Sequence, residues 1–149
     1  MYAVRICIFV FCVCYCVVCE PVSFTDCGHG NIRNVTIDTC KKQPCRFKIG
    51  TRVPFQATFV APFPSPMAFN DIHAFIERSK FLLPEPIVDA CLHHIRPGCP
   101  LRKGHVYTYK FNLLVRHIYP ATRATIEYRL TNREGSVIGC ARVPVIIVR

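Results

Sequence analysis

Residues 104–120 alternate between apolar and polar side chains with a period of two. The apolar positions are Tyr107, Tyr109, Phe111, Leu113 and Val115. Successive side chains of a β-strand point to opposite faces of the sheet, whereas helical spacing would scatter Lys110 and Arg116 among the apolar positions. We therefore expect a half-buried strand that ends before Pro120, because proline cannot donate a ladder hydrogen bond.

Other segments show the same alternation and are separated by turn residues. Residues 31–38, 53–60, 68–77, 123–130 and 137–148 are expected strands, and Pro144 in the last of them indicates an edge or a bulge. About seven short strands, with turn signals roughly every ten residues and no long helical pattern, predict an all-β fold. The expected architecture is one antiparallel, two-sheet β-sandwich.

The first 19 residues have the pattern of a secretory signal peptide. One charged residue, Arg5, precedes an apolar run at 6–18 that is short for a membrane span, although a retained membrane anchor is the alternative. We expect cleavage before Glu20, so that residues 20–149 form the mature domain. The predicted location is secreted, with the endosome or lysosome lumen as a further possibility.

Loss of this leader would remove five of the eleven cysteines. The six that remain are Cys27, Cys40, Cys45, Cys91, Cys99 and Cys140. An even number in a small secreted domain predicts three disulfides, although sequence alone does not choose among the pairings. A zinc site is the competing explanation, but the cysteines lack the paired short spacings of zinc motifs, so we expect no metal.

The mature chain is basic, with 18 Lys and Arg (19 less Arg5) against 9 Asp and Glu. Such a charge suits nucleic acid, an anionic membrane surface or a sialylated partner. The cations are dispersed and no nucleic-acid motif accompanies them, so a solvated surface is the simplest explanation. We expect an anionic membrane as partner, no nucleic acid, and a monomer.

Two further motifs lie on expected surfaces. Asn34 begins an Asn-Val-Thr triplet on the polar side of its strand and is a candidate glycosylation site. Residues 81–89 are apolar but contain Pro84 and Pro86, which predicts an irregular loop. An exposed apolar loop usually needs a partner or a ligand.

The cysteines and their neighbours form a specific order along residues 20–149. It runs from Phe24-Thr25-Asp26-Cys27-Gly28 through Gln43-Pro44-Cys45, Cys99-Pro100, Tyr107-Thr108-Tyr109 and Tyr119-Pro120 to Cys140 with Val143-Pro144-Val145. This order resembles the MD-2-related lipid-recognition (ML) family. The resemblance implies an immunoglobulin-like sandwich with a hydrophobic cavity between its sheets. It also implies the pairs Cys27–Cys140, Cys40–Cys45 and Cys91–Cys99.

The resemblance further implies sterol binding and transfer at late endosomal or lysosomal membranes. By position, Ile37, Val115, Tyr119, Pro120 and Tyr128 match pocket residues of the sterol-binding relatives. Those relatives carry Phe at Leu83 and Trp at both Tyr128 and Ala141, whereas this chain has no Trp. Because the lining differs, a fatty acid, another lipid or a small semiochemical is an alternative ligand.

Apolar residues that share the expected inner faces, together with the apolar loop, are candidates to line the cavity. They are Ile37, Phe55, Phe59, Phe81, Leu83, Phe111, Val115, Tyr119, Pro120, Ile126 and Tyr128. Each one alone is explained as well by ordinary core packing. As a group they predict a pocket for a lipid such as a sterol, with no other cofactor.

The predicted function is therefore lipid binding and transfer, with a membrane sterol transporter or a receptor as a possible recipient. The alternative is a recognition protein of innate immunity or chemosensation that presents a glycolipid, fatty acid or semiochemical to a receptor. An enzyme such as a ribonuclease would need two cooperating histidines. His105 and His117 would lie about 40 Å apart along one strand, too far to share a proton. We therefore expect that this protein is not an enzyme.

Overall fold

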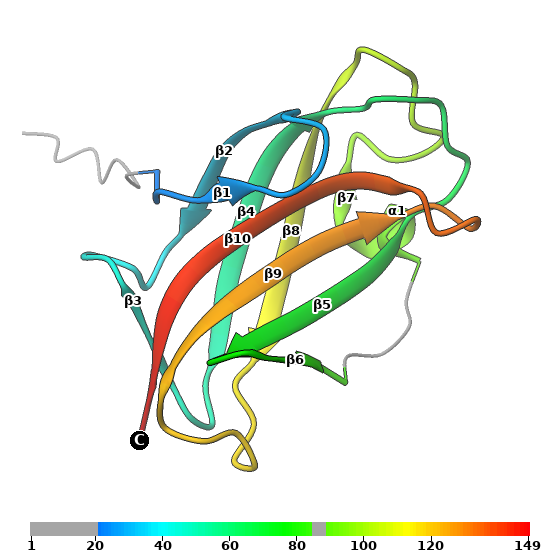
Figure 1. The fold of residues 1–149 in the computed structure, drawn as a ribbon. Coiled ribbons are helices and arrows are strands. Elements are labelled where there is room, and N and C mark those ends of the chain that lie inside the picture. Colours follow the sequence, from blue (N-terminus) through cyan, green and yellow to red (C-terminus); the bar gives the residue numbers. More distant parts are fainter. Residues whose placement is uncertain (1–20, 85–88) are drawn as a thin grey trace, which may run out of the picture.

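The computed structural model describes residues 21–84 and 89–149 and is a sandwich of two twisted sheets (Figure 1). One sheet contains, in order, β1 (Thr25–Asp26), β10 (Val137–Val148), β9 (Arg123–Thr131), β5 (Phe69–Ile76) and β6 (Ser79–Leu82), and β3 (Cys45–Lys48) also pairs with β10. The other contains β2 (Ile32–Ile37), β4 (Arg52–Val60), β8 (Val106–Leu114) and β7 (Ile95–Arg96). The all-β sandwich predicted from the alternation is confirmed. The expected signal peptide lies outside the described residues.

The central strand β8 has the register that its alternation predicts. Tyr107, Tyr109, Phe111 and Leu113 are buried on its inner face. β8 pairs with β4 in an antiparallel ladder that sets Phe55 beside Phe111 and Phe59 beside Tyr107. On the facing sheet, the inward residues of β9 are Ala124, Ile126, Tyr128 and Leu130. These inner faces form one continuous hydrophobic core.

Short strands account for most differences from the expected fold. The described residues form ten strands rather than about seven, because β1, β3, β6 and β7 have only two to four residues each, too few to show an alternation. β3 also runs parallel to β10, an exception to the antiparallel plan. One four-residue helix, α1 (Ala90–His93), follows Asp89, whose side chain accepts a hydrogen bond from the Cys91 N–H. No helix in the described ranges is long and apolar enough to cross a membrane.

Two local expectations need correction. Phe81 and Leu82 belong to the edge strand β6, paired with β5, so the irregular segment begins only at Leu83. Its residues 85–88 lie outside the described part of the chain. Pro144 lies within a central strand, between the β10 residues that pair with β1 and those that pair with β3, while the β10 irregularity is at Val137–Gly139.

Three disulfides join the pairs that the family resemblance implies. Cys27–Cys140 ties the residue after β1 to β10, across a sequence separation of 113. Cys40–Cys45 closes the loop before β3, and Cys91–Cys99 holds α1 to the segment after β7.

Candidate functional site

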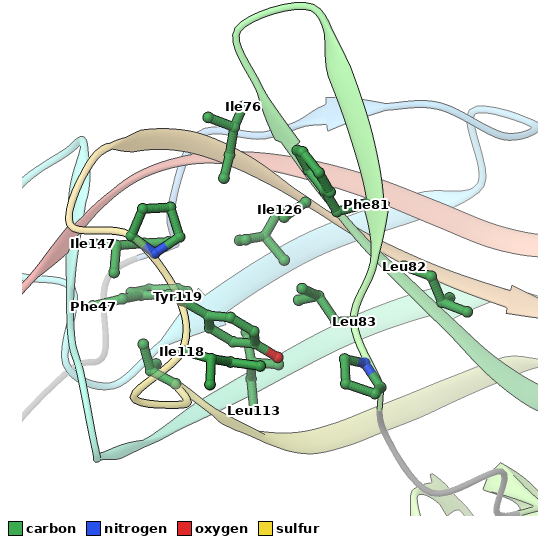
Figure 2. Close-up of a pocket in the computed structure, with 14 residues that line it drawn as sticks. Phe47, Ile76, Phe81, Leu82, Leu83, Leu113, Ile118, Tyr119, Ile126 and Ile147 are labelled. Atoms are coloured by element: carbon green, nitrogen blue, oxygen red, sulfur yellow. The ribbon is translucent and has the colours of Figure 1, made fainter.

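A cavity of about 500 Å³ lies between the sheets at one end of the sandwich (Figure 2). Its inner surface is built by residues of five strands and the segment after β8: Phe47, Ala74, Leu113, Val115, Ile126 and Ile147. These side chains are all buried. The described lining contains no charged side chain, so the cavity suits an apolar ligand.

Strand register explains why these residues meet. β3 lies parallel to the end of β10, which places Phe47 beside Ile147. β5 and β9 place Ala74 beside Ile126, and the small Ala74 side chain leaves room at that point. The cavity therefore lies at the end of the sandwich that contains the C-terminal residues of β3, β8 and β10.

The mouth of the cavity is formed by two segments. One contains Ile76 with Phe81, Leu82, Leu83 and Pro84, and the other contains Ile118, Tyr119 and Pro120. Phe81, Leu82 and Ile118 are 50%, 65% and 79% exposed, respectively. The Arg116 guanidinium donates a hydrogen bond to the Pro84 carbonyl and so connects the two segments. The cavity is therefore apolar and has an exposed apolar rim, and part of that rim comes from the proline-containing segment 81–89 singled out in the sequence.

The opposite end of the interior is filled by aromatic rings. Phe55 of β4 and Tyr128 of β9 stack with their ring centroids 3.8 Å apart, and Phe59 lies over Tyr107 at 5.8 Å. A void of about 10 Å³, far smaller than a lipid, lies beside the Phe55, Tyr128 and Phe59 rings. The hollow therefore occupies one end of the sandwich and not its whole length.

The structure divides the eleven sequence-predicted lining residues into two groups. Six line the cavity: Phe81, Leu83, Val115, Tyr119, Pro120 and Ile126. Five do not: Ile37, Phe55, Phe59, Phe111 and Tyr128, because they pack in the closed end or the core beside it. Lipid contact by any of the eleven stays a prediction.

Several lining residues were missed by sequence reasoning. Leu113 and Ile147 lie on faces whose alternation was recognised, so strand parity could have included them. Phe47 belongs to β3, whose four residues alternate but form too short a segment to have been among the expected strands. Ile118 lies in a loop and has no periodic signal.

The main charged cluster lies on the outer face of the β5–β9–β10 sheet, away from the cavity. Glu127 is 1% exposed and accepts hydrogen bonds from Lys80 (3.1 Å) and Arg142 (2.7 Å). Burial raises the pKa of Glu127, but the hydrogen bonds and charges of these two cations outweigh it and lower the pKa below its ordinary value. Glu127, Lys80 and Arg142 thus form an ion-pair network that links β6, β9 and β10 on the outer face of this sheet.

Two other features of this face bear on metal binding and acid–base chemistry. Burial lowers the pKa of His73, whose ring nitrogens lie 3.5 Å from Asp71 and 3.7 Å from Glu127. Glu127 also lies near the sulfur atoms of Cys27 and Cys140, but these form a disulfide and have no thiolate to offer a metal.

Comparison with known proteins gives consistent matches over nearly the whole described chain. The family model described as ML domain matches residues 21–147. NPC intracellular cholesterol transporter 2 of Mus musculus is 32% identical over 132 residues, 86% of this chain and 86% of the relative. The Bos taurus protein of that name is 30% identical over 128 residues, 85% of each chain. Mite group 2 allergen Pso o 2 of Psoroptes ovis is 25% identical over 114 residues, 76% of this chain and 78% of the allergen.

Solved structures share the fold. A Niemann-Pick type C2 protein from Japanese carpenter ant superposes with a TM-score of 0.74 at 19% identity, covering 85% of this chain and 100% of the ant chain. Chicken MD-1, crystallised in complex with lipid IVa, gives a TM-score of 0.54 at 18% identity, with 83% and 86% of the two chains covered.

Proposed function

The chain belongs to the ML domain family, and we propose that it carries a sterol in the cavity between its sheets and exchanges it with membranes. The observation that carries this proposal is the apolar, partly open cavity of about 500 Å³. Ligand pockets for small molecules usually have volumes of about 300–1,000 Å³, so one lipid of modest size is the expected occupant. The sterol is chosen because the relatives from mouse and cattle are cholesterol transporters by name.

Burial of the ligand alone is sufficient for useful affinity. A sterol has roughly 28 heavy atoms, and about 0.3 kcal/mol per atom gives about −8 kcal/mol, or a micromolar dissociation constant. No ionic anchor is needed for this value, which agrees with a described lining that carries no charge. Micromolar affinity also leaves the lipid free to dissociate into an acceptor membrane.

The exposed rim provides a route for exchange. Phe81, Leu82 and Ile118 surround the mouth and can enter the apolar region of a bilayer. Lys and Arg residues of the basic chain can hold the protein near anionic lipid, at about 1 kcal/mol for each cation close to the surface. The lipid would then pass from bilayer to cavity without crossing water.

The proposal also names a cellular compartment and a recipient for the lipid, and it includes no catalytic role. Three disulfides suit an oxidising compartment, which supports secretion, with an endosomal or lysosomal site of action as part of the proposal. No catalytic role is proposed, and the relatives from mouse and cattle are transporters by name. The recipient is proposed to be a membrane or a membrane-bound sterol carrier.

The decisive experiment identifies the cargo. The secreted protein is purified from its native source or a eukaryotic host without detergent, extracted with organic solvent and analysed by mass spectrometry. A stoichiometric sterol supports the proposal. A stoichiometric acylated glycolipid would instead support the recognition function. Failure to extract any lipid, together with failure of the purified protein to bind a fluorescent sterol, would overturn it.

A further inference from the structure

Among the described residues, two hollows in the interior of the sandwich differ fifty-fold in volume. The open cavity has about 500 Å³, whereas the void at the other end has about 10 Å³. Both lie between the same two sheets, and both are lined by inward residues of β9. What separates them therefore determines how deep a ligand can reach.

The boundary between the cavity and the void falls within one step of two residues along the strands. Ile126 lines the cavity and Tyr128, the next inward residue of β9, lines the void. On the facing sheet Leu113 lines the cavity, and the next inward residue of β8 is Phe111, which pairs with Phe55. Two residues of a strand advance about 6.8 Å, so the boundary is as thin as one aromatic layer.

That layer is a ring stack that bridges the sheets. Phe55 of β4 and Tyr128 of β9 lie 3.8 Å apart between centroids and only 13° from parallel. Tyr109 packs edge-on against Phe55 at 6.0 Å. Phe55 and Tyr128 are 2% and 4% exposed, so both rings are buried in the interior beside the small void.

The residues behind the stack are of mixed size. Ala57, Gly139 and Ala141 line the void together with the larger Ile32, Phe59, Tyr109 and Leu130. Of the β9 side chains that line the void, Tyr128 is the one next to the cavity. Removing one ring would join the void to the region next to the cavity.

We infer that the Phe55–Tyr128 stack, one inward residue behind the cavity-lining Leu113 and Ile126, closes off the inner end of the cavity and sets the maximum length of the lipid that this chain accepts. The inference rests on the proposed lipid-binding function and names the residues that determine its specificity. A compact lipid or a short acyl chain fits in front of the wall, whereas the end of a longer chain stays outside the mouth. Each additional buried methylene tightens binding by about fourfold, and methylenes left outside add little.

The test is the chain-length dependence of binding. A homologous series of straight-chain fatty acids displaces a fluorescent fatty acid from the wild-type protein, and the dissociation constant is plotted against chain length. We expect it to fall by about fourfold per methylene up to a break and then level off. In Phe55→Ala the break should move to longer chains by about five methylenes. This is the number of C–C bonds, about 1.5 Å each, that fits the advance of two strand residues, about 6.8 Å.

Phe59→Ala is the matched control. Phe59 is an inward residue of the same strand, lines the same void and is equally buried, but it stacks on Tyr107 rather than across the wall. It should lose comparable stability and leave the break unchanged. If Phe55→Ala does not fold, Tyr128→Leu opens the wall from the other sheet and should give the same shift.

The outcomes separate this inference from the proposed function. A shift in Phe55→Ala or Tyr128→Leu that is absent from Phe59→Ala supports the wall. An unchanged break in a folded wall variant, or an equal shift in the control, overturns the wall while lipid binding stands. A wild-type protein that binds sterol but no fatty acid, or that shows no chain-length break, also overturns the wall, and one that binds neither fatty acid nor sterol overturns both.

Discussion

Replacing Leu82 by serine tests whether the rim of the cavity contacts membranes. Leu82 is 65% exposed beside the mouth, and Figure 2 shows its side chain directed away from the centre of the cavity. Complete burial of a leucine contributes about 1.5–3 kcal/mol. About two-thirds of that area is still free, so insertion into a bilayer would gain about 1–2 kcal/mol that serine cannot supply.

This free energy corresponds to a fall in membrane affinity of about 5- to 30-fold. The assay measures transfer of a fluorescent sterol between donor and acceptor vesicles that contain anionic phospholipid, with co-sedimentation as the direct reading of membrane binding. We expect both the transfer rate and the bound fraction of Leu82→Ser to fall. Sterol affinity in solution should change much less, because most of the lining is retained.

Leu92→Ser is the matched control. Leu92 is 69% exposed, but it lies on α1 and is not part of the cavity lining. Its replacement removes as much exposed apolar surface without altering the rim. Equal losses in the two variants would indicate a nonspecific effect of surface hydrophobicity, and unchanged transfer by Leu82→Ser would refute docking through this rim.

Three further predictions concern the cavity and the stability of the fold. Ala74→Phe should fill part of the cavity and lower the amount of sterol bound per folded molecule, measured by extraction and mass spectrometry; unchanged loading would mean that the sterol lies elsewhere. Replacing both Cys27 and Cys140 by alanine should cost about 4–5 kcal/mol in urea unfolding, because their bond closes a loop of over a hundred residues; a loss below about 1 kcal/mol would contradict that entropic argument. Burial lowers the pKa of His73 and His94, so the folded protein binds protons less readily than the unfolded chain, and its free energy of unfolding should fall as the pH drops below about 6.5. Replacing both histidines by asparagine should flatten that pH dependence, and an unaltered slope would assign it to other groups.

Long strands were predictable from the sequence because each repeats its pattern several times. β8 and β9, with nine residues each, show four inward positions in register, and the structure has them as predicted. β3 and β6 have four residues each, too few for their alternation to identify a strand from the sequence, although β6 pairs with the adjacent β5 through a short hairpin. The parallel pairing of β3 with β10 depends in this way on distant parts of the chain.

The position of the cavity was harder to predict than its existence. Alternation identifies which side chains face inward, but it does not say whether facing residues touch. Phe55 and Tyr128 both have inward parity, and it is their contact across the sheets that removes them from the lining. Ile118 enters the lining from a loop, where parity carries no information, and Phe47 enters it from a four-residue strand that was not among the expected ones.

Side-chain size along the inner faces of β8 and β9 nevertheless explains which end is hollow. On β8 the inward series passes from Tyr107, Tyr109 and Phe111 to Leu113, with Val115 following, so large rings give way to smaller aliphatic groups. On β9 the bulky Tyr128 occupies the filled end, and Ile126 faces the cavity. Two sheets kept apart by stacked rings at one end cannot close fully over smaller side chains at the other, because the strands are continuous and stiff. The hollow thus follows from the size gradient of the facing strands β8 and β9, whereas β10 has its small residues Gly139 and Ala141 at the filled end and Ile147 at the cavity. Aromatic residues at the aliphatic end of β8 and β9 would be expected to close the hollow.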